Sequence, residues 1–337
     1  MAYIVFENIE KYYGENHVLK NTNLSIQKGE FVTLLGSSGC GKSTLLRCLA
    51  GLEGVTSGKI FLDGEDITFR NPKERNIGMI FQQYSLFPNM DVYNNISFGL
   101  RMKKVKKDII DDLVKNALKM VDLQGYEKRY PYQLSGGEQQ RVALARCIVT
   151  KPKVLLLDEP LSAVDAKLRK SLQSRIKEIH KELNMTSIFV THDQDEAMTM
   201  SDTIHIMRDG VIEQSGSPFE IYSNPKSIFT ASFVGNYNIL ERNQFSKLIN
   251  QEYSAYSRIV IRPETIEISP IEMENCKDSY FIFGKIIDIL PQGNIIRYTV
   301  DINSIFLKVD VLFNDLELYA LGQEVYLKLK KRHCIGL

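Results

Sequence analysis

A glycine-rich stretch at residues 36–44 has the residue types and spacing of a phosphate-binding loop. It reads G-x-x-x-x-G-K-S, a pattern in which backbone N–H groups wrap phosphates at the start of a helix. Lys42 is expected to reach the β- and γ-phosphates, and the Ser43 hydroxyl to bind Mg²⁺. A surface turn is the alternative, but an apolar strand-like run precedes the loop and a leucine-rich helical run follows it. The expected nucleotide-binding residues here are Gly36, Ser37, Ser38, Gly39, Cys40, Gly41, Lys42, Ser43 and Thr44.

Two acidic residues end a second apolar run, at residues 154–157. Asp158 is placed to hold Mg²⁺ through its water shell, and Glu159 to polarise an attacking water. Helix capping is the alternative for two acids after a strand. The following Pro160 and the shaped turn at residues 162–165 favour a functional role.

His192 follows a third apolar run, at residues 187–190. A single histidine is more often a core or surface residue. This one stands where open parallel sheets place their ligands, at the carboxyl end of a strand. It is therefore expected to contact the γ-phosphate and to hold the catalytic geometry.

A short segment, LSGGEQQR at residues 134–141, is expected to form a second phosphate-binding surface. Gly136 and Gly137 expose backbone N–H groups, and the Ser135 hydroxyl lies beside them. One ATP needs only one such cradle. The second is therefore expected to serve the ATP of a partner subunit.

The elements that must position these residues follow from the pattern of apolar positions. Strand-like runs alternate with helical ones, which predicts a parallel α/β core. Beyond about residue 237, prolines and glycines separate short alternating runs, which predicts a small all-β barrel. The clearest runs are strands at 31–35, 154–157, 187–190, 298–302 and 324–329, and helices at 45–49 and 108–121.

Composition sets the outer limits. A chain of 337 residues predicts two domains. Its net charge of +1 gives no argument for a nucleic-acid partner, and none is expected. Five cysteines without a CxxC pair predict reduced thiols in a cytosol. No apolar run approaches the ~20 residues of a membrane span, and no signal-peptide pattern opens the chain, so the chain is expected not to cross a membrane unaided.

Over about residues 3–240, the ordered motifs resemble the ATP-binding subunits of ABC transporters. Residues 36–44 look like Walker A, 154–159 like Walker B and 134–141 like the family signature. The resemblance implies ATP hydrolysis with Mg²⁺ in a head-to-tail dimer, Walker A of one copy facing residues 135–137 of the other. It also implies an α/β P-loop NTPase domain over residues 1–237, with a helical subdomain at about 85–150.

Site residues can be carried over from this resemblance one by one. The aromatic that stacks on adenine matches Tyr13, with Tyr12 as the adjacent alternative, and the Q-loop glutamine matches Gln82. The D-loop match is residues 162–165, which contain Asp165, and the switch histidine matches His192. The expected catalytic residues are thus Glu159, His192, Gln82 and Lys42. The expected metal-binding residues are Ser43, Gln82 and Asp158, and the second cradle comprises Ser135, Gly136, Gly137 and Glu138.

Two positions depart from the commonest family pattern. Glu138 replaces a glutamine at the end of the signature, and Val164 replaces a leucine in the D-loop. Neither removes a phosphate ligand, so ATPase activity is expected to survive. The hypothesis for Glu138 is that its carboxylate, near the partner's ATP, weakens dimer closure unless Arg141 or lysine neighbours compensate.

The second half of the chain resembles a particular group of bacterial importers. Residues 216–225 and 229–238 are similar to importer ATPases for sugars, polyamines, phosphonates, sulfate and iron(III). Residues 261–264 look like the entry to their OB-like (TOBE-type) regulatory domain, expected at 238–337. Polyamine (spermidine or putrescine) and 2-aminoethylphosphonate importers look nearest.

This group implies partners and a location. A second copy of the chain, membrane permease subunits and, indirectly, an extracytoplasmic solute-binding protein are expected, with the chain peripheral on the cytoplasmic face of the cell membrane. The family resemblance implies that residues 83–96 form a docking groove for a permease helix. The alternative is a small core under a loop. The basic run at residues 101–107 either faces anionic lipid or is a solvated linker.

Other classes of P-loop protein fit less well. Chromosome-maintenance ATPases separate Walker A from the signature by a long coiled coil, whereas about 90 residues without sustained heptads intervene here. Ribosome-acting ATPases usually carry two ATPase units in one chain. A soluble P-loop kinase would lack the Ser-Gly-Gly cradle.

Overall fold

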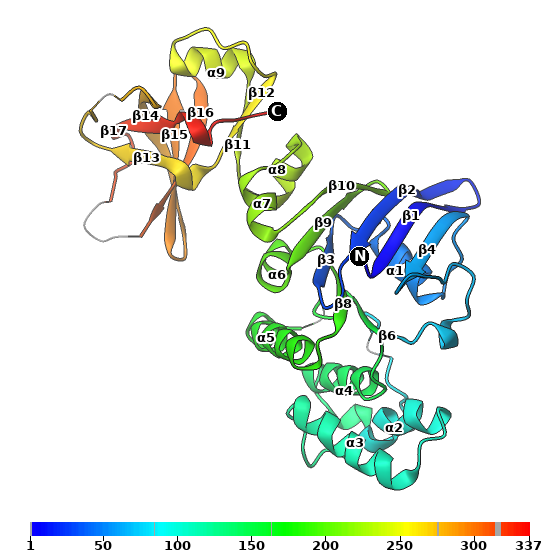
Figure 1. Ribbon diagram of the computed structural model, residues 1–337. Helices are drawn as coiled ribbons and strands as arrows, with labels where there is room; N and C mark the ends of the chain where they lie inside the picture. Colours follow the sequence, from blue (N-terminus) through cyan, green and yellow to red (C-terminus); the bar gives the residue numbers. More distant parts are fainter. Residues whose placement is uncertain (1, 84, 163, 275, 314–317) are drawn as a thin grey trace. The chain divides into compact units, whose positions relative to one another are not determined.

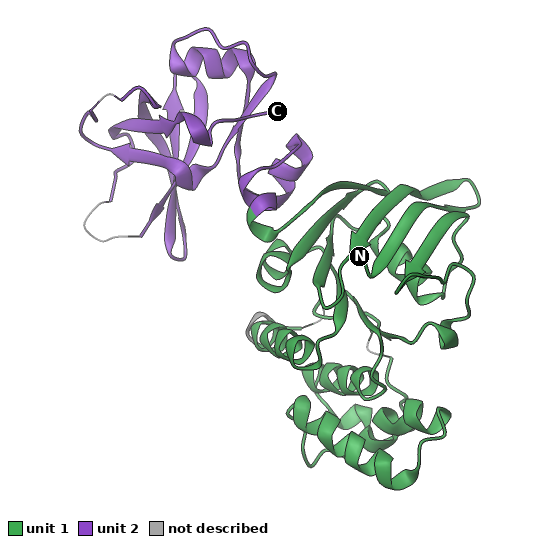
Figure 2. Ribbon diagram, in the orientation of Figure 1, with its two compact units in different colours: residues 1–219 green, residues 220–337 purple. Residues whose placement is uncertain are grey.

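The computed structural model describes residues 2–83, 85–162, 164–274, 276–313 and 318–337. The chain forms two compact units, residues 1–219 and 220–337 (Figure 2). This division precedes the boundary near residue 237 that the sequence suggests. The division falls within helix α7 (Pro218–Ser223), and helix α8 (Ile228–Val234) lies between it and residue 237.

A six-stranded sheet forms the centre of the first unit, in the order β10-β9-β3-β8-β7-β6 (Figure 1). Its parallel strands are β3 (Phe31–Leu35), β6 (Ile77–Ile80), β7 (Val154–Asp158), β8 (Thr186–Thr191) and β9 (Thr203–Arg208), and β10 (Val211–Gly216) is antiparallel. The parallel strands therefore all end at the same edge, which brings the segments after β3, β6, β7 and β8 together.

Both faces of this sheet are covered, which explains why its strands are apolar throughout. In β7, Val154 and Leu156 pack into one core with α1 (Lys42–Ala50), while Leu155 and Leu157 pack into another core with α5 (Ala166–Leu183). The first core is closed by an antiparallel sheet of β2 (Asn16–Ile26), β1 (Ile4–Tyr13), β4 (Ser57–Leu62) and β5 (Glu65–Asp66).

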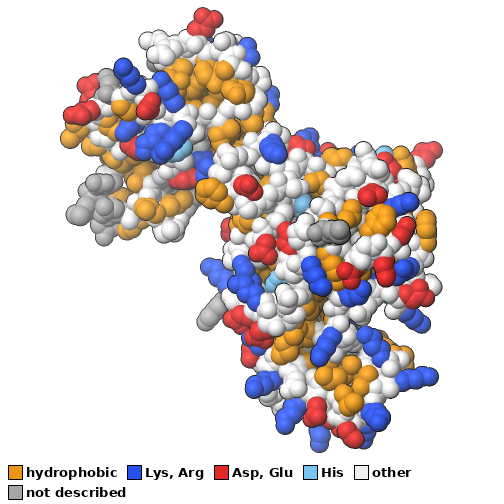
Figure 3. Space-filling model, viewed as in Figure 1, with side chains coloured by type: hydrophobic (Ala, Val, Ile, Leu, Met, Phe, Trp, Pro, Cys, Tyr) orange, Lys and Arg blue, Asp and Glu red, His pale blue; other side chains and the backbone are white. Residues whose placement is uncertain are grey.

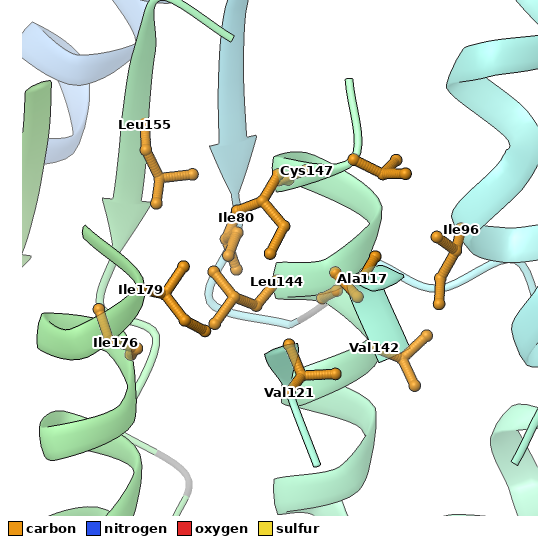
Figure 4. Packing of buried hydrophobic residues seen from close by; sticks show 14 of the residues in the cluster. Ile80, Ile96, Ala117, Val121, Val142, Leu144, Cys147, Leu155, Ile176 and Ile179 are labelled. Atoms are coloured by element: carbon orange, nitrogen blue, oxygen red, sulfur yellow. The ribbon is translucent and has the colours of Figure 1, made fainter. Parts of the chain in front are cut away.

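The second core extends into a helical part made of α2 (Val92–Met102), α3 (Lys107–Met120) and α4 (Gly136–Ile148). Figure 4 shows Ile176 and Ile179 of α5 on one side of Leu144 in α4, and Ile96 of α2 on the other. Because one apolar cluster runs through α2, α4 and α5, the N-terminus of α4 is held against the rest of the first unit. α6 (Gln194–Met200) follows β8.

Antiparallel strands dominate the second unit. β13 (Ile266–Ser269), β17 (Glu324–Lys330), β14 (Ser279–Gln292), β15 (Ile295–Ile302) and β16 (Ile305–Leu312) form a five-stranded sheet in that order. A smaller sheet joins β11 (Asn238–Glu241), β12 (Arg258–Ile261) and β18 (Ile335–Gly336), and α9 (Arg242–Ile249) packs on the shared core. The expected all-β region, consistent with an OB-like domain, is confirmed.

Among the described helices, none is both long and apolar enough to cross a membrane.

Candidate nucleotide site

The glycine-rich loop connects β3 to the N-terminus of α1, as its sequence predicts. A Cβ at Gly36 would lie 2.3 Å from the carbonyl oxygen of Met207 and 2.7 Å from the Cys40 sulfur, so no side chain fits there. Gly41, which precedes the helix, has a φ of 105°, a conformation that side-chain-bearing residues rarely adopt. The loop can therefore turn its backbone N–H groups toward an anion at the helix N-terminus.

Lys42 is buried inside this loop. Its ammonium donates to the carbonyl oxygens of Gly36, at 2.7 Å, and Ser37, at 2.8 Å. Both acceptors are neutral, and among the described residues no carboxylate forms an ion pair with this ammonium. A phosphate oxygen would be a stronger acceptor for it.

The Ser43 hydroxyl joins the loop to the end of β7. It donates to Oδ1 of Asp158 at 2.6 Å, and Arg47 lies 4.0 Å from the other carboxylate oxygen. Asp158 is only 4% exposed. Hydroxyl and carboxylate oxygens are the hard donors that Mg²⁺ prefers, so this pair fits the metal expected from the sequence.

Glu159 and His192 meet across the ends of β7 and β8. Nδ1 of His192 lies 3.4 Å from Oε2 of Glu159, and the Glu159 side chain is 18% exposed against 54% for His192. Glu159 adopts a φ of 46°, which is strained for a residue with a side chain. The strained turn and the histidine together hold this carboxylate at the edge of the sheet.

A cavity of about 330 Å³ lies in front of these groups. Lys42, Ser43, Gln82 and Glu159 all contribute to its walls. Four residues from three separate parts of the chain are thus brought to one hollow, as their positions at the ends of parallel strands predict.

The turn that carries His192 is braced by a polar network. The Thr191 hydroxyl donates to Oε2 of Glu196 at 2.6 Å, and burial raises the pKa of Glu196. Arg169 of α5 lies 3.3 Å from Oδ2 of Asp193 and donates to the carbonyl oxygen of Val164 at 3.1 Å. Arg169 therefore links the expected D-loop to the His192 turn, and no local motif in the sequence points to it.

The signature segment forms the N-terminus of α4. The Ser135 hydroxyl accepts from the N–H of Glu138 at 3.3 Å, and Oε2 of Glu138 accepts from the N–H of Ser135 at 2.7 Å, a reciprocal capping box. This contact, ahead of all other causes, lowers the pKa of Glu138. The S-x-x-E spacing is a sequence signal for this cap. The Glu138 carboxylate is thus bound within its own helix. Its negative charge is stabilised first by the N–H of Ser135 and only to a smaller extent by Arg141.

Gly137 has a packing reason to be glycine. A Cβ there would lie 2.4 Å from Cδ2 of Leu168 in α5, whereas one at Gly136 would meet nothing within 4 Å. Asp165 caps α5 by accepting from the N–H of Leu168 at 3.0 Å. Of the described residues, those of the signature and Asp165 do not line the cavity beside Lys42. Ala163 of the D-loop match lies outside the described residues.

Two tyrosines compete for the role of adenine platform at the end of β1. The ring of Tyr12 stacks on His17 with centroids 4.0 Å apart. Nζ of Lys11 lies over the ring of Tyr13, 4.6 Å from its centroid, and partial burial raises the pKa of Tyr13. Both rings are more than 40% exposed, so both candidates stand.

Known proteins match this chain along its length. The family model described as ABC transporter matches residues 19–162. The "Spermidine/putrescine import ATP-binding protein PotA" of Pasteurella multocida is 44% identical, covering 96% of this chain and 94% of that protein. The "Fe(3+) ions import ATP-binding protein FbpC" of Escherichia coli O157:H7 is 52% identical over a region that covers 72% of this chain and 69% of that protein.

A solved structure shares the fold of the first unit. It is described as a dimeric structure of a post-hydrolysis state of the ATP-binding cassette MJ0796 bound to ADP and Pi. It has a TM-score of 0.58 and 33% identity, covering 64% of this chain and 98% of that one. The α/β core with a helical part is thereby confirmed, and the chain belongs to the ABC transporter family.

Proposed function

We propose that this chain is the ATP-hydrolysing subunit of a bacterial importer whose solute is a polyamine of the spermidine and putrescine class. The observation that carries this proposal is the reach of the match to the polyamine-import relative, which extends through both compact units. Iron(III) import is the second candidate, because the ferric-ion relative is more nearly identical over the shorter region that it matches.

In this function the loop binds the phosphates of ATP. The Lys42 ammonium exchanges its two loop carbonyls for phosphate oxygens, which pair its charge. Ser43, Asp158 and Gln82 would hold Mg²⁺, which when bound neutralises charge on the transferred phosphoryl group.

Glu159 then acts as general base. It accepts a proton from water as the water oxygen attacks the γ-phosphorus and the bond to the ADP oxygen breaks. The imidazole of His192, 3.4 Å away, holds the carboxylate in place. The strain at Glu159 is consistent with a geometry set before the substrate arrives.

The chain works with partners in this proposal. Residues 135–137 and Asp165 serve the ATP of a second copy, and binding of two ATPs closes the dimer. Permease subunits dock on the helical part, the solute-binding protein acts through them, and the chain is peripheral on the cytoplasmic face of the membrane.

The motor is tested by Glu159→Gln, with Glu182→Gln as control because that side chain is exposed on α5. In the complex reconstituted with its permease, Glu159→Gln should bind ATP but turn it over at least ~100-fold more slowly, while the control is unchanged. Near-normal turnover in Glu159→Gln would remove the general-base role.

The solute is tested separately. Thermal unfolding of the associated solute-binding protein is followed with spermidine, putrescine, 2-aminoethylphosphonate and ferric ion, and the best ligand is then tested for ATP-dependent uptake. Stabilisation by a polyamine is expected. Stabilisation by ferric ion alone would overturn the polyamine proposal without affecting the motor.

A further inference from the structure

The last long strand of the second unit carries a dense group of cations. Lys328 and Lys330 are two residues apart on β17, so both side chains project from the same face of the sheet. Both contact the single carboxylate of Glu267 on the neighbouring strand β13, at 3.1 and 2.6 Å. Two ammonium groups therefore share one negative charge.

Two further cations, Lys331 and Arg332, follow directly in the chain. Both are exposed, and within the described ranges neither forms an ion pair. Nζ of Lys331 lies 5.2 Å from the ring centroid of Tyr280. Figure 3 shows Lys and Arg side chains gathered on the visible face of this unit.

These residues surround a hollow of about 430 Å³. Its walls include Lys328, Lys330, Lys331 and Arg332, together with Ser279 and one carboxylate, Asp278. With Glu267 included, four cations face two carboxylates, which leaves a local surplus of two positive charges. The whole chain, by contrast, has a net charge of only +1.

Neighbouring groups respond to this surplus. Hydrogen bonding to Lys330 is the largest cause that lowers the pKa of Glu267. The pKa of His333 is lowered first by burial and then by the charges of Arg332 and Lys330. The nearby positive charges therefore add to the effect of the hydrogen bond on Glu267 and to the effect of burial on His333.

We propose that this hollow binds a phosphate-bearing anion. A phosphate group supplies negative charge against the surplus. The guanidinium of Arg332 offers paired donors to phosphate oxygens, and lysine ammonium groups act as point charges beside it. The Ser279 hydroxyl supplies a neutral donor in the same wall. The site lies wholly within the second unit and does not depend on the ATP site or on the transported solute.

Such a phosphate could belong to a soluble molecule or to a lipid headgroup, and two assays on the full chain distinguish these sources. The first is calorimetric titration with inorganic pyrophosphate, with the glycine-rich loop saturated with Mg²⁺ and ADP. The second is co-sedimentation with vesicles of phosphatidylcholine containing phosphatidylglycerol, compared with phosphatidylcholine alone. The test variant is Lys331→Gln/Arg332→Gln, whose side chains are exposed and whose loss should not unfold the protein. The control is Lys115→Gln/Lys119→Gln, which removes two exposed charges from α3.

Pyrophosphate binding that weakens at least ~10-fold in the test variant only supports the proposal with a soluble ligand. Selective loss of sedimentation with phosphatidylglycerol vesicles in the test variant supports it with a lipid headgroup. If the test and control variants match in both assays, the hollow is only a solvated basic surface and the proposal is overturned.

Discussion

Replacing Glu138 tests whether this residue acts on its own helix or on the nucleotide. Its carboxylate accepts from the N–H of Ser135 at 2.7 Å and stands at the N-terminus of α4. Glu138→Gln keeps an acceptor at this position but removes the charge. Glu138→Ala removes both.

The expected magnitude follows from that contact. A hydrogen bond to a charged group contributes about 1 kcal/mol more than a neutral one, and a carboxylate at a helix N-terminus adds about 0.3–1 kcal/mol. Because Glu138 is only partly buried, solvent screening reduces both terms. We expect Glu138→Gln to lower the free energy of unfolding by about 0.5 kcal/mol and Glu138→Ala by about 1 kcal/mol.

Urea unfolding as a function of pH measures this directly. The pKa of Glu138 is lowered in the folded state, so its stabilisation is complete above the unfolded-state pKa of about 4.3 and is lost as the pH falls through the folded-state value. The difference between wild type and Glu138→Gln should therefore vanish in acid. A double-mutant cycle with Ser135→Ala should show coupling, because the two residues cap each other.

Turnover decides between the two roles. Since the carboxylate is already bound to Ser135, Glu138→Gln should change ATP turnover less than ~3-fold, equivalent to about 0.7 kcal/mol. A tenfold or larger change with unaltered stability would refute this reasoning and support the hypothesis that Glu138 opposes dimer closure. Additive effects in the double-mutant cycle would refute the capping contribution.

Three further predictions follow from other contacts. Arg169→Gln should slow turnover ~10-fold, about 1.4 kcal/mol, because it releases Val164 from Asp193; partial recovery in Arg169→Lys is expected, and wild-type kinetics in Arg169→Gln would contradict the link. Arg75→Met should lower the free energy of unfolding by about 2–4 kcal/mol, since buried Arg75 donates to four backbone carbonyls, two of them at the end of α1; an unchanged urea midpoint would contradict it. Burial lowers the pKa of His205 to about 4, so the unfolded chain binds an extra proton between about pH 4 and 6.5; stability should rise with pH across that window, and His205→Asn should flatten the slope.

The local geometry of the candidate nucleotide site can be predicted from the sequence, because its groups follow short, local patterns. A strand, a loop of fixed spacing and a helix are consecutive in the chain, so their geometry is set by neighbouring residues. The strand ends that carry Asp158, Glu159 and His192 were recognisable for the same reason.

Contacts that join distant segments were not recognisable in this way. Arg75 binds the carbonyl oxygens of Cys48 and Leu49, which are 27 and 26 residues away in the chain. Arg169 binds the capping carboxylate of Asp193, which is 24 residues away. Such partners leave no local side-chain motif in the sequence. Glu138 shows the opposite case. Its S-x-x-E spacing is a local signal that predicts a helix cap, whereas the family resemblance by itself predicts a position near the nucleotide.

Residue type and short spacing predict which groups of this chain can bind phosphate and metal, since they define the donors, the acceptors and the turn that exposes them. Which of these groups meet depends on how distant segments pack together. Ser43 and Asp158 are 115 residues apart in the chain, yet the Ser43 hydroxyl lies 2.6 Å from Oδ1 of Asp158. Glu159 and His192 follow two different strands, β7 and β8, and their side chains meet at the edge of the sheet. The physical reason is that parallel pairing of β3, β8 and β7 aligns the carboxyl ends of strands at one edge, and that register is set by apolar packing on both faces of the sheet.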